Sequence, residues 1–337
     1  MKIIFFDVKD NEKDILANFC LNEHQCEFYP EPLDDKIILS EEIKQADVIS
    51  CFTFSRVSKE ILQQFSNLKL IALRSVGFDH IDVGYCKANN IAVVNSFGYG
   101  NVTVAEFAFG LILDVMRKTA RSYMNLRNEH LDRDTYTGFE LKNSTIGVIG
   151  TGAIGAEVAR IAKGFEMNVL AYDIYPKEEL KEKYAVRYVE LEDLLKNSDV
   201  ISLHAPLTDS NFHMIDDEKI KLMKSNAVIV NTARGELIDT KALYEALSEN
   251  RIFGAGLDVL EAENILTNPE KSWDFDYLKD DVIKQTLIND RLLRLHNVVI
   301  TPHIAYNTKQ AQDRILSITM NNIKSFFEGK LQNSVIR

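Results

Sequence analysis

Short apolar runs alternate along this chain with segments in which apolar residues recur at helical spacing. The first part of the chain carries such runs at residues 2–6, 47–52, 68–73 and 90–96. More follow at residues 145–150, 168–173, 199–205, 226–233, 254–259 and 297–302. Alternation of this kind predicts βα units whose parallel strands are buried on both faces.

The two sets of runs predict an α/β protein with two doubly wound parallel-sheet domains. Residues 102–118 predict a helix that is apolar almost all round, so we expect it to be buried against another domain or another subunit. Residues 119–143 are polar and weakly periodic, which favours an extended arm or a pair of short helices. Residues 308–329 have the pattern of a final helix with Gly329 as its C-cap.

Charge and composition exclude some classes of protein. The 337 residues are 46% hydrophobic and carry a formal net charge of -11. Binding to nucleic acid or to an anionic membrane needs clustered Lys and Arg, and an acidic chain argues against both, although one local cation can still bind an anionic substrate. No apolar run is long enough for a membrane span, and the first ten residues are too poor in apolar side chains for a signal peptide. We therefore expect a soluble, cytoplasmic protein.

The four cysteines are Cys20, Cys26, Cys51 and Cys86. They form no CxxC pair and show no His/Cys metal spacing. In a chain of this length we interpret them as reduced, mostly buried thiols. We expect no metal site.

A glycine motif, GTGAIG, follows the run at 145–150 and opens a helical segment. Gly150 allows a tight turn, Gly152 lets the backbone approach a pyrophosphate, and Gly155 allows close packing of helix on strand. Asp173 ends the next run, where its carboxylate would accept hydrogen bonds from ribose hydroxyls and repel a 2′-phosphate. No Arg follows Asp173 directly, so the motif predicts NAD rather than NADP.

Polar side chains stand at the ends of later predicted strands, where open α/β sheets bind their ligands. They are Arg234, Asp258 with Glu263 shortly after it, and His303. Alone, each has a structural explanation such as a salt bridge or a solvated loop. Together they suit hydride transfer to a 2-keto acid, in which a cofactor does the redox chemistry. An Arg binds the substrate carboxylate through two parallel hydrogen bonds, a His moves the proton, and a carboxylate raises the pKa of that His.

A family resemblance extends almost from end to end. It is carried by GFELKNSTIGVIGTGAIG (138–155), SDVISLHAPLTDSNFHMID (198–216), MKSNAVIVNTARGELIDTKAL (223–243), RSVGFDHID (74–82) and TPHIAY (301–306). The chain resembles the D-isomer-specific 2-hydroxyacid dehydrogenase family, and within it most closely the D-lactate dehydrogenase branch. The resemblance implies reversible, NAD-dependent reduction of a small 2-keto acid, with pyruvate as first choice, to the D-2-hydroxy acid.

The resemblance also implies roles for particular residues. Arg234 matches the residue that binds the substrate carboxylate, His303 the proton donor and acceptor, and Glu263 the carboxylate paired with it. Asp258 falls near the nicotinamide carboxamide. Besides the three glycines and Arg234, cofactor contacts are implied at Ala153, Ile154, Asp173, Ala205, Pro206, Asn211, Thr232 and Ala233. Substrate contacts are implied at the backbone of Val76 and Gly77 and at the aromatic rings of Tyr99 and Tyr306.

In the family fold, a Rossmann NAD-binding domain is inserted into a flavodoxin-like substrate domain. For this chain the resemblance implies a substrate domain of residues 1–98 and 305–337 and an NAD-binding domain of residues 99–304. The helix near 102–118 would build a homodimer interface, and the cleft between the domains would admit the keto acid.

Some features depart from the family pattern. Tyr99 is followed by Gly100 and Asn101 where the lactate branch has Ser and Pro. Glu263 lies 40 residues before His303, so we expect a surface extension within 264–296. Glu261 is close enough to Glu263 to be the alternative partner of the His.

Three alternatives remain beside a pyruvate-reducing enzyme. The first is a dehydrogenase for bulkier keto acids. The second is another member of the superfamily, although a formate-type enzyme is expected to carry Gln at Glu263 and a phosphoglycerate-type enzyme often carries an added C-terminal domain. The third is a non-enzymatic NAD-sensing co-repressor with the same fold, which we expect to add disordered tails.

Overall fold

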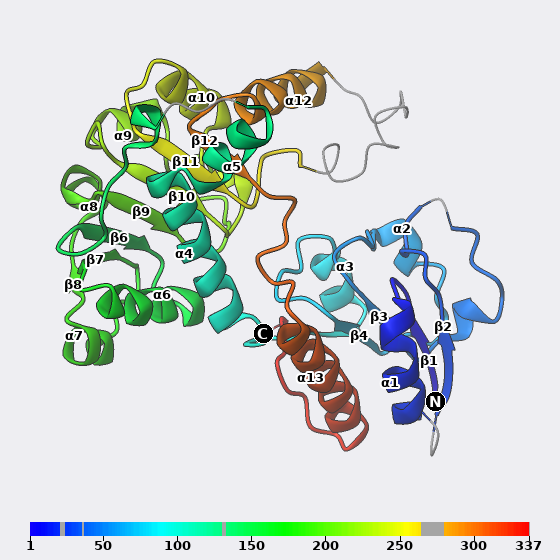
Figure 1. Cartoon of the computed structure of the whole chain (residues 1–337). Coiled ribbons are helices and arrows are strands. Elements are labelled where there is room, and N and C mark those ends of the chain that lie inside the picture. The colour runs from blue at the N-terminus through cyan, green and yellow to red at the C-terminus, as the bar shows by residue number, and fades with distance from the viewer. Residues whose placement is uncertain (21–23, 36, 130–132, 264–279, 337) are drawn as a thin grey trace. The chain divides into compact units, whose positions relative to one another are not determined.

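The structure is a computed structural model that describes residues 1–20, 24–35, 37–129, 133–263 and 280–336. It divides into two compact units, Met1–Tyr99 with Thr308–Arg337 and Gly100–Asn307 (Figure 1). The division falls after residues 99 and 307, where the resemblance implied 98 and 304. Each unit is built on one parallel sheet, which confirms the predicted fold class.

The first unit has a five-stranded parallel sheet in the order β2-β1-β3-β4-β5, which is the flavodoxin-like order. Its strands are β1 (Lys2–Phe5), β2 (Gln25–Phe28), β3 (Val48–Cys51), β4 (Leu70–Leu73) and β5 (Ala92–Val94). Neighbouring residues of one strand enter different hydrophobic clusters, as Ile3 and Ile4 of β1 do, so both faces of the sheet are buried. The edge strand β2 is only half-buried, and its sequence QCEF lacks the apolar run by which the other strands were predicted.

Helices cover both faces of this sheet. They are α1 (Asp10–Cys20), η1 (Ile43–Gln45), α2 (Lys59–Leu62), α3 (Val83–Ala88) and α13 (Lys309–Phe327). The last helix, α13, lies beside α1 in Figure 1 and buries Leu316 and Ile323 against the core of the sheet. Thr308 caps its first turn by accepting a hydrogen bond from the Ala311 N–H. The predicted final helix is therefore present, and it completes the core of the first unit.

The second unit has a seven-stranded parallel sheet in the order β12-β11-β10-β9-β6-β7-β8. Its strands are β6 (Thr145–Ile149), β7 (Asn168–Tyr172), β8 (Arg187–Tyr188), β9 (Val200–Leu203), β10 (Val228–Asn231), β11 (Gly254–Leu257) and β12 (Val298–Ile300). The strand order reverses between β6 and β9, and open α/β sheets bind ligands beyond the carboxyl ends of the strands at such a switch point. Its helices are α4 (Asn101–Arg117), α5 (Thr119–Arg127), η2 (Asp134–Tyr136), α6 (Ala153–Gly164), α7 (Glu178–Tyr184), α8 (Leu191–Asn197), α9 (Asp217–Lys221), η3 (Gly235–Leu237), α10 (Thr240–Ser248) and α12 (Asp280–Leu293).

The apolar helix predicted at 102–118 is α4, and its buried side packs on strands and a helix of its own unit, where another domain or another subunit was expected as its partner. It lies against β10, β11, β12 and α6. Glycines on β11 make this close approach possible, because a Cβ on Gly254 would lie 2.7 Å from Val115 Cγ1 and one on Gly256 would lie 2.9 Å from Leu111 Cβ. The shorter helix α5 follows directly and has no buried residue. With η2, it accounts for the pair of short helices predicted in 119–143.

The prediction of four reduced thiols is wrong for two of the cysteines. Cys20 and Cys26 form a disulfide, while Cys51 and Cys86 are free and buried. Cys20 ends α1 and Cys26 lies in the neighbouring strand β2, so helix packing brings together two residues whose spacing in sequence gave no sign of pairing. Burial raises the pKa of the Cys86 thiol to about 11 and also raises that of Cys51, so both are protonated at neutral pH.

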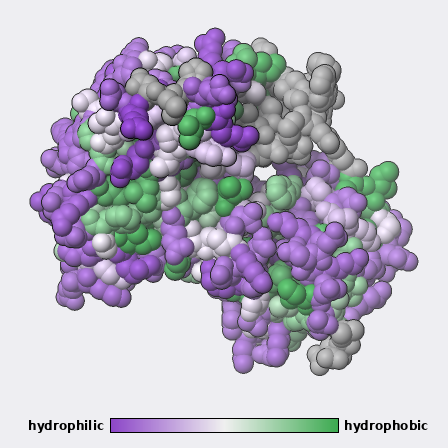
Figure 2. Space-filling view, viewed as in Figure 1, coloured by the Kyte–Doolittle hydropathy of each residue, from purple (hydrophilic) through white to green (hydrophobic). Residues whose placement is uncertain are grey.

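Hydrophilic side chains cover most of the surface that Figure 2 shows, with hydrophobic ones in smaller groups. Within the described residues, no helix combines the length and the apolar content that crossing a membrane requires.

Candidate functional site

A tight turn joins β6 to α6 and carries the three predicted glycines. Gly150 has a φ of +89°, a left-handed conformation that favours glycine, and a Cβ there would lie 2.6 Å from the Ala205 nitrogen. A Cβ on Gly155 would lie 2.0 Å from the Gly150 carbonyl oxygen, so only glycine lets α6 approach the turn. Gly152 has open space beside it, and Ala153 and Ile154 form the first turn of α6. The turn is therefore closed toward the sheet and open at the helix N-terminus, as a phosphate-binding loop requires.

Asp173 lies at the carboxyl end of β7, beside this turn. Its Oδ2 accepts hydrogen bonds from the Thr151 N–H at 2.5 Å and the Thr151 hydroxyl at 2.9 Å. Its Oδ1 accepts one from the Tyr175 N–H at 2.8 Å. These bonds fix the carboxylate at the position where the fold binds a ribose.

The loop after β9 contains the predicted contacts Ala205, Pro206 and Asn211. The Asn211 side chain folds this loop on itself, because its Nδ2 donates to the Pro206 carbonyl at 2.7 Å and its Oδ1 accepts from the Thr208 N–H at 2.7 Å. His204 precedes the loop with its Nε2 2.8 Å from the Ser202 hydroxyl. Burial lowers the pKa of His204 to about 3, so the ring is neutral.

Arg234 follows β10 in a turn shaped by a buried side chain that the sequence did not single out. Asn231 donates from Nδ2 to the Arg234 carbonyl at 2.7 Å and accepts at Oδ1 from the Ala233 N–H at 3.0 Å. The Arg234 guanidinium donates from Nη1 to the Ala233 carbonyl at 2.7 Å. Thr232 Oγ1 is buried without a hydrogen-bond partner in the described part of the chain, as expected for a hydroxyl that meets a bound polar ligand. The open glycine turn and this hydroxyl both fit a dinucleotide.

His303 and Glu263 are brought together by the fold, although 40 residues separate them in the chain. The His303 Nδ1 lies 2.6 Å from Glu263 Oε1, and the other oxygen of Glu263 accepts from the Leu260 N–H at 3.1 Å. His303 has a φ of +54°, in a region that residues with a Cβ seldom occupy and that is often found at functional sites. Because Nδ1 faces Glu263, the second ring nitrogen, Nε2, is the one that can exchange a proton with a substrate.

Opposing effects act on the His303 ring. Burial alone would lower the pKa of His303, but the hydrogen bond and negative charge of Glu263, together with the charge of Asp258, outweigh it. The nearby Arg234 charge acts to lower the same pKa. The net effect is a pKa above the ordinary value of 6.5, so the ring holds its proton more strongly than an ordinary histidine does.

Asp258 lies at the end of β11 and organises the His303 loop. Its carboxylate accepts hydrogen bonds from the Thr301 hydroxyl at 2.6 Å, the Ile304 N–H at 2.9 Å and the Ala305 N–H at 2.8 Å. Its backbone carbonyl accepts from the His303 N–H at 2.9 Å. Burial raises the pKa of Asp258 despite these bonds. The structure thus assigns this carboxylate a local role that the sequence did not predict.

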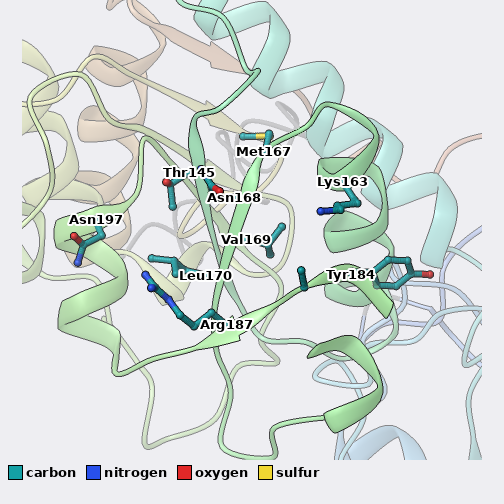
Figure 3. Close-up of a pocket in the computed structure, with 10 residues that line it drawn as sticks. Thr145, Lys163, Met167, Asn168, Val169, Leu170, Tyr184, Arg187 and Asn197 are labelled. Carbon is teal, nitrogen blue, oxygen red and sulfur yellow. The ribbon is translucent and has the colours of Figure 1, made fainter. Parts of the chain in front are cut away.

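A cavity of about 200 Å³ adjoins the His303–Glu263 pair, with Leu260, Leu293 and Ile300 on its apolar side. A larger cavity of about 490 Å³ lies at the amino ends of β6 and β7 (Figure 3). Figure 3 shows Lys163 and Tyr184 on one side of β7 and Asn197 on the other. No predicted site residue lines this larger cavity. It lies at the amino ends of the strands, whereas the glycine turn lies at the carboxyl end of β6.

In the first unit, Val76 and Gly77 follow β4 in a loop where the carbonyl oxygens from Ser75 to Gly77 each accept a hydrogen bond. The Ser75 carbonyl accepts from the Ser96 N–H at 2.9 Å, that of Val76 from Asn95 Nδ2 at 2.7 Å, and that of Gly77 from the Ser75 hydroxyl at 2.7 Å. The N–H groups of Val76 and Gly77 have no hydrogen-bond partner within the described residues. Adjacent N–H groups without partners can bind an anionic group.

Arg74, which opens the RSVGFDHID stretch, anchors this loop. It is 1% exposed and donates from Nη2 to the carbonyls of Phe6 at 2.6 Å and Asp7 at 2.8 Å, so it ties the end of β4 to the end of β1. Of the two predicted aromatic contacts, Tyr99 is almost buried in the first unit, where its carbonyl accepts from Arg314 Nε at 2.7 Å. Tyr306 belongs to the second unit and follows the His303 loop.

The chain is similar to known proteins over most of its length. Residues 109–305 match the family model described as D-isomer specific 2-hydroxyacid dehydrogenase, NAD binding domain. A crystal structure of D-lactate dehydrogenase from Aquifex aeolicus, complexed with NAD and lactic acid, is 38% identical, covers 99% of both chains and superposes with a TM-score of 0.89. A hydroxypyruvate reductase of Thermotoga maritima is 39% identical over 296 residues, which are 88% of this chain and 89% of that protein.

The D-3-phosphoglycerate dehydrogenase of Methanocaldococcus jannaschii is 39% identical over 299 residues, which are 88% of this chain. The chain spans about half, 53%, of the length of that relative. These relatives share the fold and differ in the substrates after which they are named.

The glycine turn after β6 and the contact between His303 and Glu263 are features expected of an NAD-binding α/β dehydrogenase. The chain belongs to the family of D-isomer specific 2-hydroxyacid dehydrogenases. Its cofactor is NAD, and its activity is that of an NAD-dependent 2-hydroxyacid dehydrogenase.

Proposed function

We propose that the protein reversibly reduces a small 2-keto acid to the D-2-hydroxy acid, with pyruvate as the first choice of substrate. The observation that carries this proposal is the 2.6 Å contact between His303 Nδ1 and Glu263 Oε1, which raises the pKa of the His303 ring and suits it to donate a proton. The lactic acid bound to the Aquifex aeolicus relative supports pyruvate and D-lactate as the substrate pair.

Each proposed catalytic residue has one task. Arg234 binds the substrate carboxylate through its planar guanidinium, and the N–H groups of Val76 and Gly77 are proposed as further donors to it. His303 gives its proton to the carbonyl oxygen during reduction and takes it from the hydroxyl during oxidation. Glu263 keeps the ring oriented and stabilises its charged form. Bound NAD(H) supplies or accepts the hydride.

We further propose which residues hold the cofactor and line the substrate site. The pyrophosphate is assigned to Gly150, Gly152 and Gly155 with the N–H groups of Ala153 and Ile154, and the adenosine ribose to Asp173. The remaining cofactor contacts are assigned to Ala205, Pro206, Asn211, Thr232, Ala233, Arg234 and Asp258. The rings of Tyr99 and Tyr306 are proposed to limit the size of the substrate side chain.

Two alternatives are tested beside this proposal. A dehydrogenase for other 2-keto acids keeps the same mechanism, and the name of the Thermotoga maritima relative favours including hydroxypyruvate among the substrates tested. An NAD-sensing co-repressor would keep the nucleotide site without turnover.

The decisive experiment is NADH oxidation with pyruvate, 2-ketobutyrate, 2-ketoisocaproate, phenylpyruvate, glyoxylate and hydroxypyruvate, with the chirality of each product determined. Fast formation of D-lactate from pyruvate is the expected result. Turnover of bulky acids only would keep the mechanism and change the substrate. No turnover by a protein that still binds NADH would overturn the proposal and favour the co-repressor.

We also propose a homodimer located in the cytoplasm. The interface is proposed on the helix near 102–118, which is α4 and exposes Val102 and Leu113. It is extended by α5, which buries none of its residues and exposes Tyr123, Met124 and Leu126. The cytoplasmic location is tested by cell fractionation. Thiol labelling of the recovered protein shows whether Cys20 and Cys26 are bonded in the cell, because disulfides are rare in the cytoplasm. Recovery of the protein outside the cytoplasm would contradict the proposed location.

A further inference from the structure

Glu261 is held by more bonds than an ordinary loop carboxylate. Its Oε2 accepts hydrogen bonds from the Thr240 N–H at 3.0 Å and the Thr240 hydroxyl at 2.5 Å, both at the start of α10. Its Oε1 lies 2.7 Å from His213 Nε2, in the segment that follows the predicted cofactor loop. The Glu261 side chain is 13% exposed. Both oxygens are therefore engaged, each by a different part of the second unit.

The backbone of Glu261 is held from a third side, by α12. The Asn289 Nδ2 donates to the Glu261 carbonyl at 2.8 Å, and Asn289 in turn accepts at Oδ1 from Gln285 Nε2 at 3.2 Å. Asn289 is fully buried. The helix α12 belongs to the predicted surface extension, of which residues 264–279 lie outside the described part of the chain.

The turn that contains Glu261 is the one that presents Glu263. Glu263 Oε2 accepts from the Leu260 N–H at 3.1 Å, so the direction of its carboxylate depends on the backbone of this turn. On its other side the turn rests on Gly235, where a Cβ would lie 2.1 Å from the Leu260 carbonyl carbon. Because Gly235 follows Arg234 directly, a movement of the turn would reach both the acid–base pair and the carboxylate-binding residue.

We propose that Glu261 is a positioning residue: its contacts with Thr240, His213 and Asn289 fix the turn that holds Glu263 against His303. This inference rests on the proposed function of the His303–Glu263 pair. It also gives α12 a role, which is to hold the catalytic turn through Asn289.

Electrostatics explain why the turn needs this support. Glu236 lies close to Glu261 and Glu263, and burial followed by the charges of those two carboxylates raises the pKa of Glu236. Three carboxylates in one region repel one another unless hydrogen-bond donors and cations stabilise their negative charges. The Thr240 donors and the His213 ring engage Glu261, which leaves Glu263 to His303.

The test is Glu261→Gln, which keeps the size of the side chain and removes its charge. The first readout is the pKa of the His303 ring, measured from the NMR shifts of the histidine rings as the pH of the cofactor-free protein is varied. The His303 signal is identified by its loss in His303→Gln. If Glu261 positions Glu263, the pKa of His303 falls in Glu261→Gln, in the same direction as in Glu263→Gln and by less. Asn289→Ala is expected to shift it in the same direction.

The second readout is the kinetics of keto-acid reduction. In Glu261→Gln, the loss of activity on the alkaline side moves to lower pH, and kcat near neutral pH falls by roughly 100-fold at most. The KM for NADH changes little, because the glycine turn and Asp173 are untouched. A role confined to stability would lower the temperature of unfolding and leave both the pH profile and the His303 titration in place.

The matched control is Glu245→Gln on the outer side of α10, where the carboxylate is 3.8 Å from Lys241 Nζ. It is expected to match the wild type in every readout. An unchanged His303 titration in folded Glu261→Gln, beside a shifted one in Glu263→Gln, would overturn this inference and leave the proposed function standing. Normal turnover in Glu263→Gln would instead overturn the proposed function of the pair.

Discussion

At the scale of single residues, three carboxylates within six positions have three different surroundings. Asp258 accepts hydrogen bonds from the loop that carries His303, Glu261 from the start of α10, and Glu263 lies against the imidazole. The chemistry of a carboxylate is the same at all three positions. Its partners decide whether it shapes a loop, holds a turn or raises the pKa of a His.

Arg234→Lys tests the assignment of the substrate carboxylate. Lysine keeps the positive charge and loses the planar pair of donors, so we expect the KM for the keto acid to rise roughly 10-fold to 100-fold. The dissociation constant of NADH, followed by fluorescence, should stay close to that of the wild type. An unchanged KM would contradict this role of Arg234.

His303→Gln tests the proton transfer. Glutamine preserves the polarity of the side chain but cannot gain or lose a proton near neutral pH, so kcat should fall about 100-fold to 10,000-fold. Titration with NADH is the control, since binding should survive. Turnover close to the wild-type rate would eliminate His303 as the proton donor.

The pH dependence of the two reaction directions should be opposite. The pKa of His303 is raised above its ordinary value of 6.5 by Glu263 and Asp258, so the ring keeps its proton to a higher pH than an ordinary histidine does. Reduction needs the protonated ring, and its kcat/KM should fall as the pH rises through this pKa. Oxidation needs the free base and should rise over the same range. Profiles that bend in the same direction would contradict a single acid–base group at His303.

Among the secondary-structure elements, α4 can pack closely on the sheet of the second unit only because β11 carries Gly254 and Gly256. Hydrophobic periodicity predicted this helix and its burial correctly, since both depend on local sequence. The sequence did not predict that α4 packs on β11. The lack of side chains at Gly254 and Gly256 becomes important only when α4 lies over these two residues. The strand β2 was missed for a related reason: pairing with β1 makes it a strand, not its own apolar content.

Gly254→Ala tests this packing. The added Cβ would meet the Asn297 carbonyl oxygen at 2.6 Å and Val115 Cγ1 at 2.7 Å, so the free energy of unfolding should fall by about 1–3 kcal/mol. The matched variant is Gly110→Ala in α4, where a Cβ has nothing within 4 Å. It should raise the same free energy by about 0.5–1 kcal/mol. Denaturation with urea measures both, and equal effects would contradict the packing argument.

At the scale of the whole molecule, two parallel-sheet units share one chain that leaves the first unit after Tyr99 and returns to it at Thr308. The returning helix α13 is part of the first core, where Leu316 and Ile323 are buried. The first unit therefore needs both ends of the chain to complete its core.

The oligomeric state is the prediction at this scale. Light scattering should give the mass of a dimer for the wild type and that of a monomer after Met124→Asp combined with Leu126→Asp, because charges on α5 would oppose burial of that helix. Ile38→Asp, at a position that is 96% exposed in the other unit, is the control and should remain dimeric. A monomeric wild type would contradict the proposed dimer.

Features that depend on neighbours along the chain could be predicted from the amino-acid sequence. Alternating runs predicted the parallel strands, GTGAIG predicted the nucleotide turn, and the strand ends indicated Arg234, Asp258 and His303 as site residues. Contacts between distant groups were known only once the chain was seen folded. The fold pairs Glu263 rather than Glu261 with His303, joins Cys20 to Cys26, and buries Arg74 behind the loop of Val76. Local periodicity reflects which face of an element is buried, whereas a pairing across 40 residues depends on how the intervening backbone packs.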